Sequence, residues 1–257
     1  MKKRLDSYLQ EKEFFASRAK AAEAISLGMV KVNGKVCKKA STKVDELDRI
    51  ESQKFNYVSR AAQKLLHALD CFGVDVKDKV AMDVGASTGG FTEVLLEKGA
   101  AEVFAVDTGE NQLSQKLIEN PKIHNMQKTN FLDVPNELVE KMDIVVSDVS
   151  FVSLTKLAWK FAQSNCPLVL LLKPQFECGK EYAKKHKGIV KDPKIHLKVI
   201  QNVLASFGEV GLFAQNIDVS PIRGGDGNVE FLLLMAKKLP QKEIDFEKIV
   251  EKAKMMV

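Results

Sequence analysis

The stretch Asp83-Val-Gly-Ala-Ser-Thr-Gly-Gly-Phe-Thr92 decides the fold class of this chain. It follows the short apolar run Val80–Val84 and opens a helical pattern, so it lies where a strand turns into a helix. In an open α/β sheet this turn borders the ligand. Glycines at positions 85, 89 and 90 let the backbone come close to that ligand. The stretch therefore predicts a Rossmann-like α/β domain with a small-molecule site at this turn.

The loop differs from two better-known glycine-rich motifs. The dinucleotide fingerprint Gly-x-Gly-x-x-Gly needs glycine at position 87, where Ser87 stands, and the loop lacks the Gly-Lys-Ser/Thr of a P-loop. An acidic residue at the end of the first strand, here Asp83, suits the cationic amino-acid end of S-adenosylmethionine. The loop therefore favours S-adenosylmethionine over a dinucleotide or a nucleoside triphosphate.

Two later strand ends carry residues that suit the same ligand. Asp107 ends the second strand, 22 residues beyond Gly85, where a carboxylate can accept hydrogen bonds from ribose hydroxyls, as it also does in NAD enzymes. Asn130 and Phe131 follow the third strand, where an amide and an aromatic face can hold an adenine. Each residue alone fits a helix cap or a core aromatic equally well. Three such sites at successive strand ends predict one cofactor pocket.

Short β-rich runs alternate with helical patterns from Lys79 onward. The expected strands are Val80–Val84, Val103–Asp107, Ile123–Gln127, Ile144–Asp148, Leu168–Leu172, Val210–Val219 and Val229–Ala236. The expected helices are Thr92–Lys98, Gln112–Glu119, Asn136–Lys141, Leu154–Phe161 and Lys194–Phe207. This alternation predicts a parallel sheet covered on both faces, and the tight glycine-rich connection predicts an antiparallel last pair. Seven strands with a terminal reversal favour a methyltransferase over a dehydrogenase.

Composition and cysteine spacing exclude several classes of protein. The 257 residues are 45% hydrophobic and 28% charged, which is typical of a soluble globular chain. The longest apolar runs, Cys166–Leu172 and Phe231–Ala236, are far shorter than the roughly 20 residues of a membrane helix. The first residues form no apolar signal core. The cysteines lie far apart without a Cys-x-x-Cys pair, at Cys37, Cys71, Cys166 and Cys178. We therefore expect a cytoplasmic protein with reduced thiols and no metal site.

The excess positive charge is concentrated at the start of the chain. Residues 1–53 contain 12 Lys or Arg and 8 Asp or Glu, a net charge of +4 out of +5 for the whole chain. Such asymmetry favours a small module that meets a polyanion, most commonly nucleic acid.

The pattern beneath this charge predicts two helices followed by a small sheet. Leu5 and Leu9 have helical spacing, and Ser17 and Gly28 can begin and end a second helix. Asn33-Gly34 is a strong hairpin signal, and a final strand is expected through residues 48–51. Arg18 and Lys20 lie in the first turn of the second helix, where the helix dipole does not favour cations. We therefore expect them to contact RNA.

Four polar residues border one rim of the predicted sheet. Lys64 lies in an amphipathic helix before the first strand, Asp148 ends the fourth strand, Lys173 ends the fifth and Glu230 lies in the last. A lysine at the mouth of an apolar strand is a functional-site candidate, because burying it unpaired is costly. One such residue alone fits a surface charge, but four that border the same rim predict a catalytic site.

Six motifs now identify a resemblance that covers essentially the whole chain. In order, they read SRAAQKL, DVGASTGGFT, VVSDVSF, LLKPQFECG, GIVKDP and SPIRGGDGNVEF, and RLDSYL…SRAKAAEAISLGMVKVNGKV precedes them. They resemble the TlyA (haemolysin A) family of ribosomal-RNA 2′-O-methyltransferases, in which an S4 RNA-binding domain is fused to an FtsJ-like domain. The resemblance implies domains at residues 1–55 and 56–257. One departure is Ala61-Ala62, where relatives commonly carry Gly-Gly.

The resemblance also implies residue roles. A catalytic Lys-Asp-Lys-Glu tetrad falls on Lys64, Asp148, Lys173 and Glu230. S-adenosylmethionine would be bound by Asp83, Gly85, Ala86, Ser87, Gly89, Asp107, Asn130, Phe131 and Asp148. Ribosomal RNA would be contacted by Arg4, Arg18, Lys20, Arg60 and Arg223. The implied target is a cytidine in large-subunit rRNA, with small-subunit rRNA left open. Lys173 is expected to contact the 2′-hydroxyl, either as a base or as a charged donor.

Other functions stay open at this point. A haemolysin, the name that some relatives carry, would require membrane insertion. A catalytically idle RNA-binding or ribosome-assembly factor would keep the cofactor pocket but would not need Lys64 and Glu230 together. An enzyme of the same type could also act on mRNA or tRNA.

Overall fold

The computed structural model describes residues 2–15, 17–26, 28–52, 57–239 and 243–256. The chain divides into two compact units, Met1–Asn56 and Tyr57–Val257. The domain boundary expected between residues 55 and 56 lies outside the described residues.

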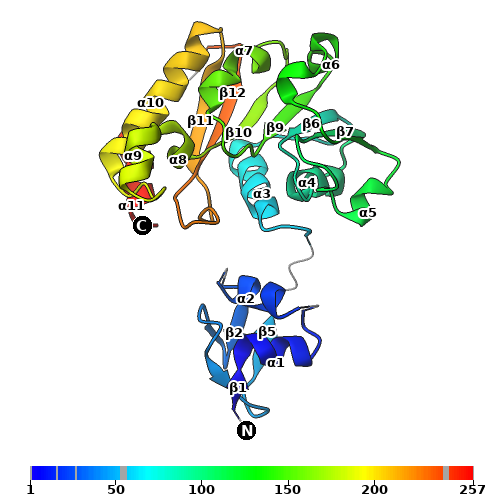
Figure 1. Ribbon diagram of the computed structural model, residues 1–257, viewed down its shortest axis with the longest axis vertical. Coiled ribbons are helices and arrows are strands. Elements are labelled where there is room, and N and C mark those ends of the chain that lie inside the picture. The colour runs from blue at the N-terminus through cyan, green and yellow to red at the C-terminus, as the bar shows by residue number, and fades with distance from the viewer. Residues whose placement is uncertain (1, 16, 27, 53–56, 240–242, 257) are drawn as a thin grey trace. The chain divides into compact units, whose positions relative to one another are not determined.

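A seven-stranded sheet forms the larger unit (Figure 1). Its strands are β6 (Val80–Val84), β7 (Glu102–Val106), β8 (Ile123–Met126), β9 (Ile144–Ser147), β10 (Leu168–Leu172), β11 (Phe213–Val219) and β12 (Phe231–Ala236). They lie in the order β11-β12-β10-β9-β6-β7-β8. The strands from β10 to β8 pair in parallel, whereas β12 is antiparallel to both β10 and β11. The predicted α/β class, the seven strands and the terminal reversal are confirmed.

Helices cover both faces of this sheet (Figure 1). They are α3 (Ala61–Phe72), α4 (Gly90–Glu97), α5 (Gln115–Ile118), α6 (Asn136–Glu140), α7 (Ala158–Phe161), α8 (Pro174–Glu177), α9 (Lys180–Lys185), α10 (Pro193–Glu209) and α11 (Phe246–Lys254). Met82 of β6 packs in the core cluster that contains Phe161 of α7 and Phe207 of α10. The next residue, Asp83, accepts a hydrogen bond from Thr92 of α4. Because successive strand residues point to opposite faces, α4 and α10 lie on opposite sides of the sheet.

The observed elements differ from the predicted ones in a few places. The helix expected at Leu154–Phe161 is split into the 3₁₀ turn η2 (Leu154–Lys156) and α7, because Ser153 caps the turn by accepting from Thr155 N. A second 3₁₀ turn, η1 (Phe131–Asp133), follows β8. The strand expected from Val210 begins only at Phe213, since α10 continues to Glu209. Helices α8, α9 and α11 were not predicted.

The smaller unit has its own core. It contains α1 (Leu5–Glu11), α2 (Arg18–Ser26), the pair β1 (Lys3–Arg4) with β4 (Lys43–Val44), and the sheet β3 (Lys35–Val36), β2 (Val30–Val32) and β5 (Ile50–Ser52). Its buried side chains are Leu5, Leu9, Ala21, Ala24, Ile25, Val30 and Val44. Asn33 and Gly34 both have positive φ angles, 52° and 77°, which are the angles that a tight type I′ hairpin requires. The predicted hairpin is confirmed.

Among the residues that the structure describes, no helix combines the length and the hydrophobicity needed to cross a bilayer.

Candidate active site

The glycine-rich loop connects β6 to α4, as the sequence predicted. Gly85 and Gly89 have φ angles of +82° and +95°, in the region that favours glycine. A Cβ atom at position 85 would lie 3.1 Å from the Cα of Val149, and one at position 89 would overlap the side chain of Leu117. Both glycines are therefore required by backbone conformation and by close packing.

Asp83 is completely buried behind this loop. Its Oδ2 accepts a hydrogen bond of 2.6 Å from Thr92 Oγ1, whereas Oδ1 has no partner among the described residues. Burial raises the pKa of the Asp83 carboxyl to about 7. An unpartnered acidic oxygen at this place fits a cationic group close to the loop, such as the amino group of S-adenosylmethionine.

Two backbone amides fix the carboxylate of Asp107. Its Oδ2 accepts from Ser87 N at 2.8 Å and its Oδ1 accepts from Gly109 N at 2.7 Å. The carboxylate is thereby oriented at the end of β7, where each oxygen keeps a lone pair for a hydroxyl. Asp107 also ties the glycine-rich loop to the segment after β7.

Asn130 and Phe131 have structural roles in addition to the predicted one. Asn130 Oδ1 accepts from Leu132 N at 3.0 Å and so caps η1. The ring of Phe131 is buried, with its centroid 4.8 Å from that of Phe161. Both residues nevertheless line the same cavity as Asp107.

This larger cavity has a volume of about 550 Å³ and runs along the carboxyl ends of β6, β7 and β9. Among the predicted cofactor residues, those that line it are Gly85, Ser87, Asp107, Asn130, Phe131 and Asp148. Asp83 and Gly89 do not line it and instead shape the loop from behind.

A smaller cavity of about 250 Å³ lies next to the larger one. Its lining includes Arg60, Lys64, Ala86, Asp148 and Lys173. The two cavities share a set of lining residues, which are Gly85, Ser87, Asp148 and Ser150. The site thus consists of two chambers with Asp148 at their junction.

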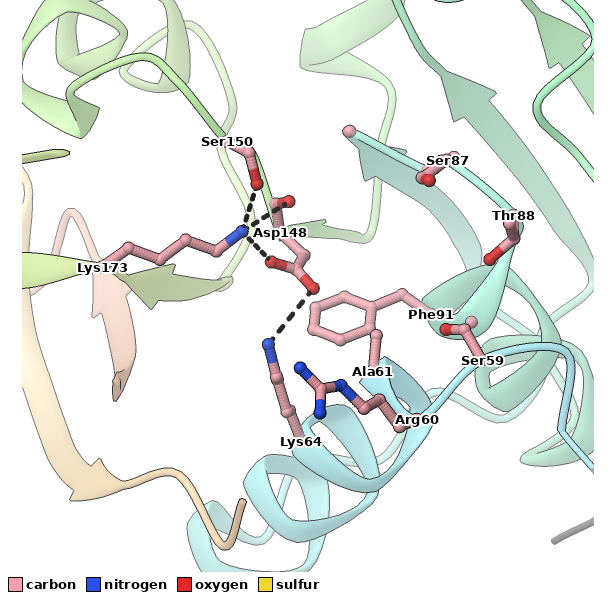
Figure 2. Close-up of a pocket in the computed structure, with 13 residues that line it drawn as sticks. Ser59, Arg60, Ala61, Lys64, Ser87, Thr88, Phe91, Asp148, Ser150 and Lys173 are labelled. Atoms are coloured by element: carbon pink, nitrogen blue, oxygen red, sulfur yellow. Dashed lines mark hydrogen bonds and ion pairs between the residues drawn. The ribbon is translucent and has the colours of Figure 1, made fainter. Parts of the chain in front are cut away.

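The four predicted catalytic side chains come together at this junction, and Figure 2 shows three of them, Lys64, Asp148 and Lys173. Lys173 Nζ lies 2.6 Å from Asp148 Oδ1, and Lys64 Nζ lies 3.7 Å from Asp148 Oδ2. Lys64 Nζ also lies 2.6 Å from Glu230 Oε2. Asp148 therefore bridges the two lysines, and Glu230 balances the second one.

All four charges are largely removed from solvent. The side chains of Lys64, Lys173 and Glu230 are less than 10% exposed, and that of Asp148 is 14% exposed. The two lysines and the two carboxylates of this tetrad have equal and opposite formal charges. Because buried charges depend on their partners, the loss of any one member leaves another uncompensated.

The glycine-rich segment 223–228 closes the side of the site next to Glu230. A Cβ atom at Gly224 would overlap the Glu230 carboxylate, and one at Gly225 would lie 3.4 Å from Arg60 Nη2. Arg223 is exposed on this segment. Within the described part of the chain, neither Arg60 nor Arg223 has an ion-pair partner. Ala61 and Ala62, the departure from the family pattern, form a regular first turn of α3.

Ser150 and Phe151 were not predicted but belong to the site. Ser150 Oγ accepts a hydrogen bond of 2.6 Å from Lys173 Nζ. The side chain of Phe151 lines the larger cavity, is 91% exposed and has a φ angle of +65°. A left-handed conformation is rare for a bulky residue and marks a strained site, which no sequence pattern reveals.

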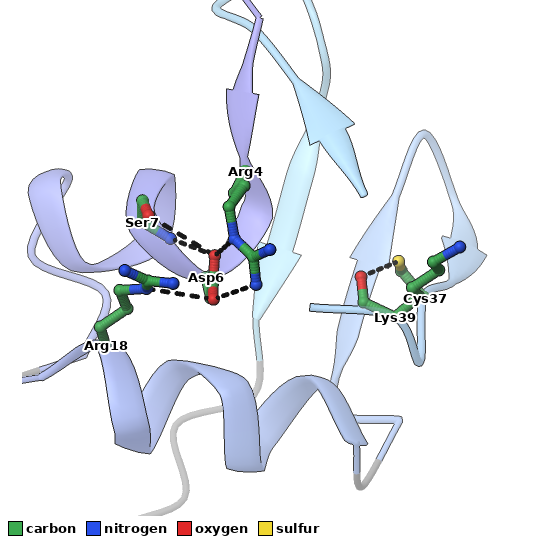
Figure 3. A network of polar contacts seen from close by, with 6 residues as sticks. All are labelled: Arg4, Asp6, Ser7, Arg18, Cys37 and Lys39. Carbon is green, nitrogen blue, oxygen red and sulfur yellow. Dashed lines mark hydrogen bonds and ion pairs between the residues drawn. The ribbon is translucent and has the colours of Figure 1, made fainter. Parts of the chain in front are cut away.

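In the smaller unit, two of the predicted RNA-binding residues also bind a buried carboxylate (Figure 3). Arg4 donates from Nε and Nη2 to the two oxygens of Asp6, at 3.0 and 2.8 Å, and Arg18 Nε donates to Oδ2 at 3.2 Å. The unfavourable position of Arg18 in the first helical turn is therefore explained by Asp6. Lys20 is exposed and has no side-chain partner among the described residues.

The fold also gathers three groups of types that bind metals, His67, Cys71 and Asp218. Asp218 Oδ2 lies 2.8 Å from His67 Nε2, and its other oxygen is paired with Lys252. Burial raises the pKa of the Cys71 thiol to about 11. Asp218 of β11 thus links α3, through His67, to α11, through Lys252, and these ion pairs explain why the three residues lie together. The expected absence of a metal stays a prediction.

Comparison with known proteins gives the same domain order. Residues 57–237 match the FtsJ-like methyltransferase family, and residues 3–50 match the S4 domain. Hemolysin A of Brachyspira hyodysenteriae is 40% identical, over 89% of this chain and 98% of the relative. The 16S/23S rRNA (cytidine-2′-O)-methyltransferase TlyA of Mycobacterium tuberculosis is 36% identical, over 90% and 88% of the two chains.

A solved structure from Streptococcus thermophilus resembles the whole chain. It has a TM-score of 0.74 and 34% identity, and the match covers 99% of this chain and 96% of that one. The chain is an enzyme with S-adenosylmethionine as its methyl donor. Both family matches and these relatives place it in the TlyA (hemolysin A) family, in which an S4 domain precedes an FtsJ-like methyltransferase domain.

Proposed function

We propose that this enzyme methylates the ribose 2′-hydroxyl of a cytidine in large-subunit rRNA, with small-subunit rRNA as a second target to be tested. The observation that carries the proposal is the pair of cavities that meet at Asp148, because a methyl donor in one lies next to an acceptor in the other. The rRNA cytidine activity in the name of the M. tuberculosis relative supports the choice of substrate.

Lys173 is the proposed contact of the 2′-hydroxyl. Bound S-adenosylmethionine would supply its methyl carbon to the 2′-oxygen in line, with the carbon–sulfur bond breaking and the sulfur leaving as a neutral thioether. Lys173 Nζ contacts Asp148 Oδ1, Ser150 Oγ and, at 3.4 Å, the backbone oxygen of Asp148, and Lys173 lines the smaller cavity. Such alignment of donor and acceptor lowers the barrier by several kcal/mol. Lys173 is therefore proposed to orient the hydroxyl, whose proton passes to the Lys173 amine if that amine is neutral and to solvent water if it is charged.

The other tetrad members position the two reactants. Asp148 lines both cavities and contacts both lysines, so it places Lys173 relative to the cofactor. Lys64, held by Glu230, is proposed to hold the target ribose. The cofactor contacts proposed for the larger cavity are Asp107 on the ribose hydroxyls and Phe131 on the adenine. Phe151 is exposed at that cavity and is proposed to contact the target base.

Basic residues in both units are the proposed RNA contacts. Arg60 lines the smaller cavity, and Arg223 lies on the adjacent segment, both without an intramolecular ion-pair partner among the described residues. Lys20 and the exposed parts of Arg4 and Arg18 provide positive charge on the S4 unit. Such contacts position RNA through its phosphates and weaken with salt.

The test is transfer of labelled methyl from S-adenosylmethionine to purified small and large subunits from a strain that lacks the enzyme. The products are digested to nucleosides, and Lys173→Ala is assayed beside the wild type. We expect labelled 2′-O-methylcytidine from the wild type alone, with cofactor affinity retained in the variant. Near-normal transfer by Lys173→Ala would refute its role. If neither subunit is labelled, the result would favour a catalytically idle RNA-binding factor or an enzyme that acts on mRNA or tRNA. Leakage of liposomes in the presence of the protein would favour a haemolysin.

A further inference from the structure

Asn228 has a buried side-chain amide, and both its carbonyl oxygen and its NH2 group form hydrogen bonds. It is 1% exposed. Its Oδ1 accepts from Val190 N at 2.8 Å, and its Nδ2 donates to Gly188 O at 2.8 Å. Its backbone oxygen also accepts from Gly224 N at 2.8 Å. Asn228 therefore joins the segment after α9 to the 223–228 segment.

The segment after α9 is fixed from its other side as well. His196 of α10 is 1% exposed, and its Nε2 lies 3.0 Å from Val190 O, which can only accept. Burial lowers the pKa of the His196 imidazole. The chain 188–190 is thus held between α10 and Asn228, and it gives the 223–228 segment a rigid support.

The supported segment lines neither cavity itself, but it contacts a residue that lines the smaller one. Gly224 packs against the Glu230 carboxylate and Gly225 against Arg60, which lines the smaller cavity. No residue of 223–228 lines the larger cavity. A shift of this segment would therefore disturb Glu230 and Lys64 on the acceptor side and leave the cofactor side intact.

We propose that Asn228 is a positioning residue that holds the 223–228 segment against Glu230 and thereby determines rRNA turnover without affecting cofactor binding. The inference rests on the proposed function for its substrate. The role needs a donor and an acceptor on two separate atoms of a short side chain, which the asparagine amide provides. Aspartate has the same shape but places an acceptor against Gly188 O.

The first experiment uses amide hydrogen exchange of the cofactor-free protein to measure how firmly Asn228 holds residues 188–190. Asn228→Asp is compared with Asn228→Ala and with Asn165→Asp, which adds the same charge at an exposed site. We expect exchange in peptides covering 186–191 to become at least about tenfold faster in Asn228→Asp, with peptides covering 83–92 unchanged. Unchanged exchange at 186–191 overturns the proposal, whatever the substrate of the enzyme is.

The second experiment separates acceptor turnover from cofactor binding. For Asn228→Asp we expect kcat/KM on rRNA to fall by about 100-fold, the cost of misplacing reacting groups by about 1 Å. S-adenosylmethionine affinity should stay within about twofold. Asn228→Ala should lose less of its kcat/KM, because it removes the two side-chain hydrogen bonds without placing a carboxylate oxygen against the carbonyl oxygen of Gly188. Asn165→Asp should have the kcat/KM of the wild type.

Three results would overturn the positioning role. They are a normal kcat/KM in Asn228→Asp, a loss of cofactor affinity in parallel with activity, and a larger defect in Asn228→Ala, which would make side-chain volume the cause. A wild-type enzyme inactive on every rRNA substrate would instead refute the proposed function, and the exchange experiment would then decide the inference alone.

Discussion

At the scale of single residues, the site is defined by charges that the protein has buried. Asp148 lies between two lysines and contacts both, so no member of the tetrad is stabilised by solvent. Asp83 is buried with one oxygen unpartnered among the described residues, which makes its charged form costly. These environments make single substitutions informative.

Asp148→Asn should destabilise the protein and abolish methyl transfer. The change leaves buried Lys173 without a carboxylate partner among the described residues and Lys64 with Glu230 alone, and breaking a buried pair costs about 3–5 kcal/mol. Asp70→Asn is the matched control, because its pair with Lys98 is largely exposed and worth at most about 1 kcal/mol. Urea unfolding measures both. Equal midpoints for Asp148→Asn and wild type would contradict the buried-tetrad account.

Asp83 should make the stability of the cofactor-free enzyme fall as the pH rises. Its folded pKa of about 7 exceeds that of an unfolded aspartate, about 4, so between these values only the unfolded state loses the proton. The slope is at most about 1.4 kcal/mol per pH unit. Thermal unfolding from pH 4 to 7 should show this slope in the wild type and lose it in Asp83→Asn. The same slope in both proteins would assign it to another group.

At the scale of elements, α3 brings residues that line the smaller cavity to the glycine-rich loop. It carries Lys64, Arg60 precedes its first residue, and its start packs on Gly90 at the beginning of α4. A Cβ atom at position 90 would overlap Ser59 Oγ and lie 3.2 Å from Ala62 N. The position of Lys64 therefore depends on how closely the two helices approach.

Gly90→Ala should reduce both stability and activity, although alanine is the better helix former. Overpacking typically costs about 1–3 kcal/mol, and displacement of α3 would move Lys64. Gly208→Ala in α10 is the matched control. It has open space around it and should stabilise the protein by about 0.5–1 kcal/mol. Thermal unfolding and methyl transfer measure the contrast. A stabilising effect at both positions would show that α3 and α4 are not in tight contact.

At the scale of the whole molecule, each unit has a separate core and separate chemistry. The S4 unit buries its own apolar residues and the carboxylate of Asp6, and the larger unit contains both cavities. Cofactor binding should therefore survive damage to the S4 unit, whereas RNA binding should not.

Asp6→Asn tests this division. Arg4 and Arg18 hold the pKa of Asp6 well below its usual range, so its stabilising effect is complete above about pH 4 and is lost as the pH falls further. We expect the S4 unit to lose about 1–3 kcal/mol and rRNA affinity to drop, with S-adenosylmethionine affinity unchanged. Glu46→Gln, which breaks an exposed pair with Lys12, is the control. Loss of cofactor affinity in Asp6→Asn would refute the independence of the units.

The sequence predicted much of the fold because its signals are local. Alternating apolar runs located all seven strands, and Asn33-Gly34 located the hairpin. The short helices α8 and α9 were missed, since four and six residues contain too few turns for a period to show. Helix α11 was missed although Phe246, Ile249 and Ala253 have helical spacing.

The sequence by itself determined the fold class, the glycine-rich loop and the four polar residues at the rim, because each depends on residue type and spacing along the chain. Only the tertiary structure decided which charges pair and which cavity each residue lines. It assigned Arg4 and Arg18 to Asp6, placed Asp148 between two chambers and joined Asn228 to the chain 188–190. The physical reason is that hydrogen bonds and ion pairs act over a few ångströms, and packing alone brings residues distant in sequence to that range.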